Sequence, residues 1–215
     1  MGGIGKTTLA RVASTQMSPH FEGKSFLADV REVSNTRGLV SLQKQLLSQI
    51  LPEECFNFFN VHEGNAIINH RLSNKKVLVV LDDVDNLQHL KCLVGRRGWF
   101  GLGSRIIVTT RDEHLLRSYG VDDVYKPTTL NAHEALQLFN LKAFNGETRL
   151  ENDFSDLSKR VLKYAGGLPL ALEVLGSFLY QTEQDIFLDI ACFFNGKEKD
   201  FVMKVLDGCE FFPVI

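Results

Sequence analysis

The sequence has no large excess of charge of either sign. Its 215 residues include 24 lysines and arginines and 26 aspartates and glutamates, which gives a formal net charge of −2. A balanced chain of this kind produces no strong field that would hold nucleic acid or an anionic membrane without specific contacts. We therefore predict no direct nucleic-acid partner.

Long hydrophobic runs are also missing. The longest are residues 77–81 and the stretch around Cys192, and a membrane-spanning helix needs roughly 20 apolar residues. The first residues are glycines and a lysine, whereas a signal peptide has an apolar core. We predict no membrane span and an intracellular protein, located in the cytoplasm or alternatively in the nucleus.

Cysteines are few, and their spacing matches neither zinc nor redox motifs. The four are Cys55, Cys92, Cys192 and Cys209. His89 and Cys92 form a single H-x-x-C pair, and a zinc site of that type needs a second pair. We predict reduced cysteines and no metal site built from them.

The sequence does contain an alternation of short apolar runs and amphipathic stretches. Strands are predicted at residues 25–30, 76–81 and 105–109, with the second covered on both faces and the third also buried. Helices are predicted at residues 7–16, 39–50 and 87–94. The alternation of the two favours an α/β fold with a parallel sheet.

After Pro127 the pattern becomes mostly helical. Asn131 can cap a helix, with Glu134 as its reciprocal partner three residues on. A second helix is predicted at residues 154–164, ended by a pair of glycines, and residues 168–179 are apolar nearly all round, which predicts deep burial. Two further helices are predicted at residues 186–194 and 200–206.

The strongest chemical signal is the stretch G-G-I-G-K-T-T at residues 2–8. Glycines let the backbone wrap a phosphate closely with its N–H groups pointing inward, and the helix that follows directs its positive end at the same anion. Lys6 would reach the β- and γ-phosphates, and the hydroxyl of Thr7 would bind Mg²⁺. The predicted phosphate-binding residues are Gly2, Gly3, Gly5, Lys6, Thr7 and Thr8.

A second signal is the pair of acids that follows the apolar run at residues 77–81. A buried strand would deliver Asp82 and Asp83 to the carboxyl edge of the sheet, where ligands of open α/β sheets bind. Asp82 would hold Mg²⁺, and Asp83 would orient or deprotonate an attacking water. The alternative is an ordinary strand followed by a polar turn.

Arg111 ends the third predicted strand segment, G-S-R-I-I-V-T-T-R at residues 103–111. From that edge it could contact a γ-phosphate and so distinguish ATP from ADP. The alternative is a surface arginine that pairs with Asp112 or Glu113. A fourth segment, G-G-L-P-L-A-L at residues 166–172, places Pro169 near the start of a buried helix, which by itself is ordinary.

Taken in order, these segments resemble the NB-ARC domain of plant nucleotide-binding leucine-rich-repeat resistance proteins. The E-A-L-Q-L-F block within residues 125–144 and F-L-D-I-A-C-F-F at residues 187–194 extend the resemblance over nearly the whole chain. Residues 26–32 and Asp85 are similar to the subclass that carries a Toll/interleukin-1 receptor domain.

The resemblance implies a switch that binds ADP at rest and ATP when activated, with slow hydrolysis as a timer. It places Asp82 on Mg²⁺, Asp83 on the hydrolytic water and Arg111 on the γ-phosphate. Lys6 would join Asp83 and Arg111 in hydrolysis, and Pro169 would lie beside the adenine and sugar. Other receptor domains or receptor chains are the implied protein partners.

The resemblance also implies a division into three parts. Residues 1–127 would form a P-loop nucleotide-binding part with an incomplete N-terminus, residues 128–180 a small helical part, and residues 181–215 a winged-helix remnant. The first P-loop glycine and the strand before it are absent, and we expect that strand to lie between the Asp82 and Arg111 strands. The junction at residues 180–184 is shorter than in the family, so we expect a partial chain.

Two other functions remain as alternatives. The chain could be a non-hydrolysing decoy or regulatory fragment that acts through protein–protein contacts, a hypothesis motivated by its partial character and its 16 phenylalanines. It could also be a DNA-binding regulator, but Lys197, Lys199 and Lys204 alternate with acidic residues and form no basic stripe.

Overall fold

The computed structural model describes residues 2–96, 98–143 and 155–181. The chain divides into two compact units, Met1–Thr128 and Thr129–Ile215. Across these described ranges, every helix is too short or too polar to cross a membrane. The predicted three-part division stays a prediction, and its winged-helix part lies outside the described residues.

Helices precede, separate and follow the strands of the first unit. The helices predicted at residues 7–16, 39–50 and 87–94 are confirmed, whereas α2, α4 and α6 were not predicted. The bounds are α1 (Lys6–Met17), the short 3-10 helix η1 (Ser18–His20), α2 (Val30–Arg37), α3 (Leu39–Ile50), α4 (Val61–Leu72), α5 (Leu87–Leu93) and α6 (Glu113–Tyr119).

Parallel strands form the sheet of the first unit. β1 (Gly23–Leu27) pairs with β2 (Val77–Leu81), and β2 pairs with β3 (Arg105–Val108), so the order is β1-β2-β3. Because the strands run in the same direction, their carboxyl ends meet at one edge of the sheet. The predicted parallel α/β sheet is confirmed.

β2 and β3 pair directly. Leu81 lies opposite Val108 in the ladder, and the amide of Thr109 continues it by donating to the carbonyl of Leu81 at 2.9 Å. β2 and β3 therefore form one unbroken ladder of backbone hydrogen bonds. The expected further strand is not part of this sequence, so its position between the two stays a prediction.

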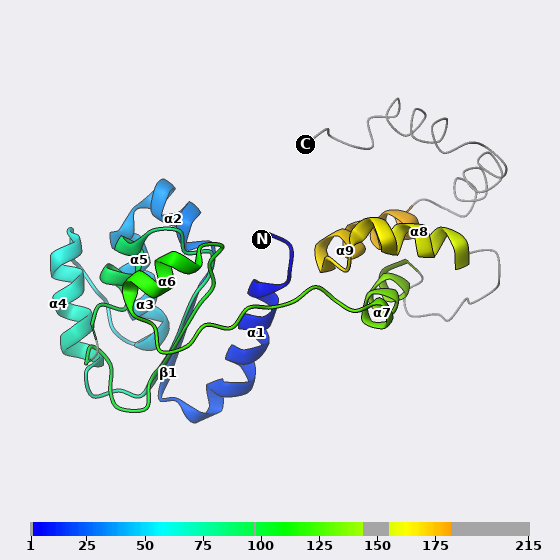
Figure 1. Cartoon of the computed structure of the whole chain (residues 1–215). Coiled ribbons are helices and arrows are strands. Elements are labelled where there is room, and N and C mark those ends of the chain that lie inside the picture. The colour runs from blue at the N-terminus through cyan, green and yellow to red at the C-terminus, as the bar shows by residue number, and fades with distance from the viewer. Residues whose placement is uncertain (1, 97, 144–154, 182–215) are drawn as a thin grey trace. The chain divides into compact units, whose positions relative to one another are not determined.

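β2 is buried on both faces, as its apolar run predicts. Val77, Val79 and Leu81 belong to the main hydrophobic core together with residues of α3, α4 and α5. Leu78 and Val80 point to the opposite face, because side chains alternate along a strand, and they are also fully buried. Figure 1 shows α1 on one side of the sheet and the group containing α3, α4 and α5 on the other.

The other two strands differ from their predictions. β1 ends at Leu27, three residues earlier than predicted, because Asp29 has a left-handed φ of 49° and turns the chain into α2. β3 is not a buried strand, since Ile106 is 42% exposed. In the described part of the chain β3 pairs with β2 alone, so its other side has no strand to cover it. Leu9 and Val12 of α1 are about half exposed as well.

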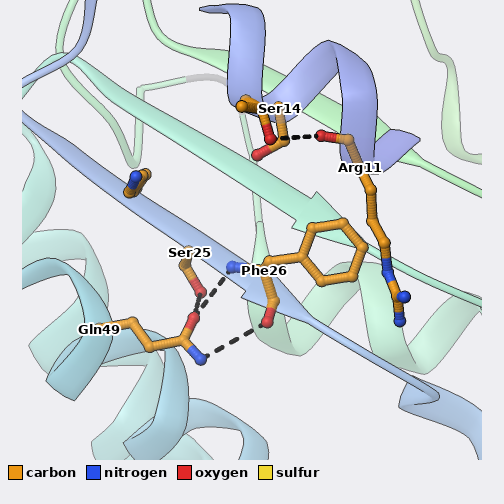
Figure 2. Close-up of a pocket in the computed structure, with 7 residues that line it drawn as sticks. Arg11, Ser14, Ser25, Phe26 and Gln49 are labelled. Atoms are coloured by element: carbon orange, nitrogen blue, oxygen red, sulfur yellow. Dashed lines mark hydrogen bonds between the residues drawn. The ribbon is translucent and has the colours of Figure 1, made fainter. Parts of the chain in front are cut away.

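The outer edge of β1 is covered by a side chain. Gln49 of α3 accepts a hydrogen bond from the amide of Phe26 at 2.9 Å and donates a long one, at 3.5 Å, to the carbonyl of the same residue. Its Oε1 also accepts from the hydroxyl of Ser25 at 2.8 Å (Figure 2). The side-chain amide thus occupies the position that a neighbouring strand would take beside Phe26.

The described helices of the second unit are α7 (Ala132–Ala143), α8 (Ser155–Ala165) and α9 (Pro169–Gln181). The predicted cap of α7 is confirmed. Asn131 Oδ1 accepts from the amide of Glu134 at 2.9 Å, and Glu134 Oε2 accepts from the amide of Asn131 at 2.9 Å. The core of this unit contains Ala135, Phe139, Ala143, Ala165 and Leu172.

α9 is less buried than its apolar sequence predicts. Leu172 is fully buried, but Leu170 and Val174 are 51% and 58% exposed. The prediction of deep burial all round is therefore wrong for one face of the helix. The helices predicted at residues 186–194 and 200–206 lie outside the described residues.

Candidate functional site

The glycine-rich segment leads directly into α1. Gly3 and Gly5 have φ values of 71° and 88°, a left-handed region that residues with a Cβ rarely adopt. No side chain caps the N-terminus of α1, and its first turn holds no acidic residue. The N-cap of this 12-residue helix is thus a glycine without a capping side chain, and the first turn brings no carboxylate of its own, which suits a helix start that binds an anion.

Thr7 joins the start of α1 to the end of β2. Its hydroxyl donates to both carboxylate oxygens of Asp82, at 2.9 and 3.1 Å. Thr109, which follows β3, donates to Asp82 Oδ1 at 2.5 Å. Asp82 is only 2% exposed, so two hydroxyl groups hold a buried carboxylate toward the glycine-rich segment.

Asp83 has an unusual backbone and a doubly paired carboxylate. Its φ is 53°, which is left-handed for a residue with a side chain, and its amide donates to Thr109 Oγ1 at 2.9 Å. Asp83 Oδ2 lies 2.8 Å from Arg31 Nη2, and Asp83 Oδ1 lies 3.5 Å from Arg111 Nε. The carboxylate therefore sits between two guanidinium groups.

Arg111 lies beside the glycine-rich segment. A Cβ added to Gly2 would lie 3.7 Å from Arg111 Nη1. The alternative that Arg111 pairs with its sequence neighbours is wrong. Asp112 caps α6 by accepting from the amide of His114, and Glu113 forms ion pairs with Arg117 and Lys126.

Thr7 and Asp82 offer oxygen ligands, which Mg²⁺ prefers. Thr7 Oγ1 and Asp82 Oδ1 lie 2.9 Å apart, and neighbouring ligands of an octahedral Mg²⁺ at about 2.1 Å are about 3 Å apart. The two side chains therefore fit the predicted ion. Among the described residues, no cluster of three or more His, Cys, Asp or Glu side chains could hold a metal, so Mg²⁺ would also need water or phosphate oxygens.

The remaining predicted residues occupy two places. Lys6 and Thr8 belong to the first turn of α1. Pro169 belongs to the second unit, where it is the first residue of α9. It follows Gly166 and Gly167, whose φ values of 56° and 71° end α8, as predicted, and turn the chain.

Sequence reasoning missed two residues of this site, Arg31 and Thr109. Thr109 could have been found, because it directly precedes Thr110 and Arg111 in the polar stretch that follows a strand. Arg31 gave no comparable signal, because its approach to Asp83 depends on the turn at Asp29 rather than on a motif.

A pocket of about 520 Å³ lies elsewhere in the first unit. Later turns of α1, the strand β1 and Gln49 of α3 line it, and Figure 2 shows Arg11, Phe26 and Gln49 around it. None of the predicted site residues lines this pocket. The candidate site is therefore the open carboxyl edge of the sheet beside α1, not this pocket.

Comparison with known proteins supports the resemblance seen in the sequence. The family model described as the NB-ARC domain matches residues 1–149. Disease resistance protein RUN1 of Vitis rotundifolia is 42% identical over 246 residues, which cover 98% of this chain and 18% of that protein. TMV resistance protein N of Nicotiana glutinosa is 42% identical over 251 residues, covering 98% and 21%.

A third relative, disease resistance protein RRS1 of Arabidopsis thaliana, is 37% identical over 248 residues, covering 99% of this chain and 18% of its own length. The chain thus spans about a fifth of the length of the relatives it matches. The alignments are longer than the 215 residues of this chain, so the relatives contain segments with no counterpart here.

Proposed function

The chain belongs to the NB-ARC family, and from this premise we propose that it is the ADP- and ATP-binding switch of an intracellular plant immune receptor. The relatives are named disease resistance proteins, and a role in defence signalling is carried over from those names. Because the chain spans only part of each relative, its partners are proposed to be other receptor domains or receptor chains.

One observation supports this proposal most strongly. Thr7, Asp82 and Arg111 come from three segments that are distant in the sequence. Thr7 nevertheless donates a hydrogen bond to Asp82, and Arg111 lies beside both Asp83 and Gly2. A phosphate-binding loop, an acidic strand end and an arginine around one helix start form the arrangement used for phosphoryl groups.

The proposed roles follow from these positions. Backbone N–H groups and Lys6 would bind the phosphates, and Thr7 and Asp82 would hold Mg²⁺, which would supply positive charge to neutralise the phosphates. Asp83 orients the attacking water or accepts its proton, and Arg111 binds the γ-phosphate. Pro169 is proposed to lie against the adenine and sugar. The proposed phosphate contacts are Gly2, Gly3, Gly5, Lys6, Thr7 and Thr8.

The contacts of Asp83 suggest why hydrolysis would be slow. Arg31 already occupies one oxygen of the carboxylate, which leaves fewer lone pairs with which Asp83 can orient a water molecule. We therefore propose that the nucleotide acts mainly as a signal, since its γ-phosphate is removed rarely.

Isothermal titration of the full chain with ADP tests the proposal, with Lys6→Ala as the diagnostic variant. Removing an ammonium group that contacts phosphate should weaken binding about tenfold or more, because hydrogen bonds to charged groups contribute about 1.5–3 kcal/mol. The matched control is Lys24→Ala. Lys24 is an exposed lysine in the first half of β1, away from the carboxyl edge of the sheet.

Two results would count against the proposal. If the folded wild-type chain bound no ADP, the alternative of a fragment acting only through protein contacts would gain support. If Lys6→Ala bound ADP as tightly as Lys24→Ala, the phosphates would have to bind somewhere other than the glycine-rich segment. Circular dichroism of each variant checks that its fold is intact.

A further inference from the structure

Two arginines hold the Asp83 carboxylate, one on each oxygen. Arg31 Nη2 lies 2.8 Å from Oδ2, and Arg111 Nε lies 3.5 Å from Oδ1. The arginines come from separate elements, since Arg31 is the second residue of α2 and Arg111 follows β3. One carboxylate thus links α2 to the segment after β3.

The two contacts are unequal. The Arg31 contact has the length of a charge-assisted hydrogen bond, whereas 3.5 Å is beyond that range. Arg111 is also the more exposed side chain, at 57% against 41% for Arg31. Since Arg111 already lies close to Gly2, it can turn to a phosphate in the glycine-rich segment with little movement. Arg31 keeps the tighter hold on Asp83.

Backbone hydrogen bonds fix the position of the chain from which the Arg31 side chain extends. The amide of Val30 donates to the carbonyl of Asp82 at 2.9 Å, and the amide of Asp82 donates to the carbonyl of Leu27 at 2.9 Å. Val30 itself is fully buried. The turn that starts α2 is therefore attached to the end of β2, immediately beside Asp83.

Asp83 is fixed from its own side as well. Its left-handed backbone conformation and the hydrogen bond from its backbone N–H to Thr109 Oγ1 fix its main chain. Only the side-chain torsions of Asp83 remain free to change. The negative charge of the Asp83 carboxylate would repel a nearby triphosphate, and a positive charge close to the carboxylate offsets that repulsion. Arg31 is placed to supply that charge once Arg111 has moved to the γ-phosphate.

We propose that Arg31 is a positioning residue that selects ATP over ADP by holding and neutralising Asp83 while Arg111 binds the γ-phosphate. This inference rests on the proposed nucleotide-binding function. It assigns the selection to a pair of arginines that share one acid, rather than to Arg111 alone. ADP lacks the γ-phosphate, so its binding should depend little on Arg31.

The test compares ADP with a non-hydrolysable ATP analogue on Arg31→Gln, Arg31→Lys and wild type, using the full chain. Arg31→Gln should raise the Kd for the ATP analogue about tenfold or more, because the Asp83 carboxylate would then repel the γ-phosphate without a positive charge to offset it. Its Kd for ADP should stay within about twofold of wild type. Arg31→Lys should recover part of the loss, because it keeps the charge but not the planar fork.

The matched control is Arg37→Gln, an exposed arginine in the last turn of the same helix, which should leave both affinities unchanged. A double-mutant cycle tests the route through Asp83. In an Asp83→Asn background, adding Arg31→Gln should no longer weaken binding of the ATP analogue, because the negative charge that Arg31 neutralises has been removed.

The outcomes separate this inference from the proposed function. If wild type bound neither nucleotide, the proposed function would fail and this inference with it. If wild type bound both and Arg31→Gln changed neither affinity, or weakened both equally, only the role of Arg31 would be overturned. Equal weakening would indicate that Arg31 supports the fold of the turn and does not distinguish the nucleotides.

Discussion

Thr109 connects the two acidic residues of the site. Its hydroxyl oxygen accepts from the amide of Asp83, and its single hydroxyl hydrogen is given to Asp82 Oδ1. Because the hydroxyl has only one hydrogen, accepting from one acid and donating to the other fixes its direction. A valine at this position would have a similar shape, but it would remove the acceptor for the Asp83 amide and one of the hydroxyl donors to Asp82.

His89 is a single residue that we predict to make stability depend on pH. It is 5% exposed, its Nδ1 has no hydrogen-bond partner, and the carboxylate of Asp85 lies 3.6 Å away. Burial lowers the pKa of His89 from 6.5, and Asp85 opposes this only in part. As the pH drops through about 6.5, the unfolded chain takes up the proton first, so the free energy of unfolding falls until the folded pKa is reached.

Urea unfolding at about pH 7.5 and about pH 5.5 measures this effect. Wild type should lose more stability on acidification than His89→Gln, whose side chain does not titrate. His62→Gln, at an exposed position of α4, is the control and should behave as wild type. Equal losses in wild type and His89→Gln would show that other groups cause the acid sensitivity.

Among the elements, α7 depends on its reciprocal cap. Replacing Asn131 by alanine removes the side-chain acceptor for the amide of Glu134, which should destabilise the second unit by about 1 kcal/mol. Chemical denaturation followed by circular dichroism measures the change. Glu134→Gln retains an oxygen for the amide of Asn131 and should cost less. If Asn131→Ala were as stable as wild type, the cap would be dispensable.

The elements show what a sequence can predict and what it cannot. α3, β2 and α7 were predicted because their apolar spacing, or a cap, is encoded within a few neighbouring residues. The exposure of β3 could not be predicted, because the run R-I-I-V is equally compatible with a central strand and an edge strand. Burial of a strand depends on its neighbours in the sheet, which local sequence does not specify.

The same limit applies to the candidate site. The glycine-rich segment and the acids after β2 are contiguous motifs with a stated chemistry, so their residues could be predicted, although their roles stay predictions. Arg31 became visible only when a left-handed Asp29 turned α2 toward Asp83. Contacts created by such a turn follow from three-dimensional geometry, not from residue spacing.

For the whole molecule, hydrogen exchange with and without ADP would show which parts respond to the nucleotide. At about 100 times its Kd, ADP stabilises the state that binds it by about 2.7 kcal/mol, so amides that exchange through unfolding of that state should slow about a hundredfold. We expect protection at the start of α1 and at the end of β2. If Pro169 contacts the nucleotide as proposed, the start of α9 should be protected as well.

Lys6→Ala under the same ADP concentration is the control and should lose most of this protection. Protection confined to the first unit would remove Pro169 from the proposed contacts and leave the phosphate contacts in place. Protection unchanged in Lys6→Ala would contradict the assignment of the glycine-rich segment.

Gln49 has a consequence for how separate molecules meet. An extended chain approaching β1 from outside would find the amide and carbonyl of Phe26 already engaged by a glutamine that is anchored on a helix. Such a chain could add to the sheet there only by first displacing that side chain. The outer edge of β1 is therefore poorly suited to start cross-β aggregation at Phe26.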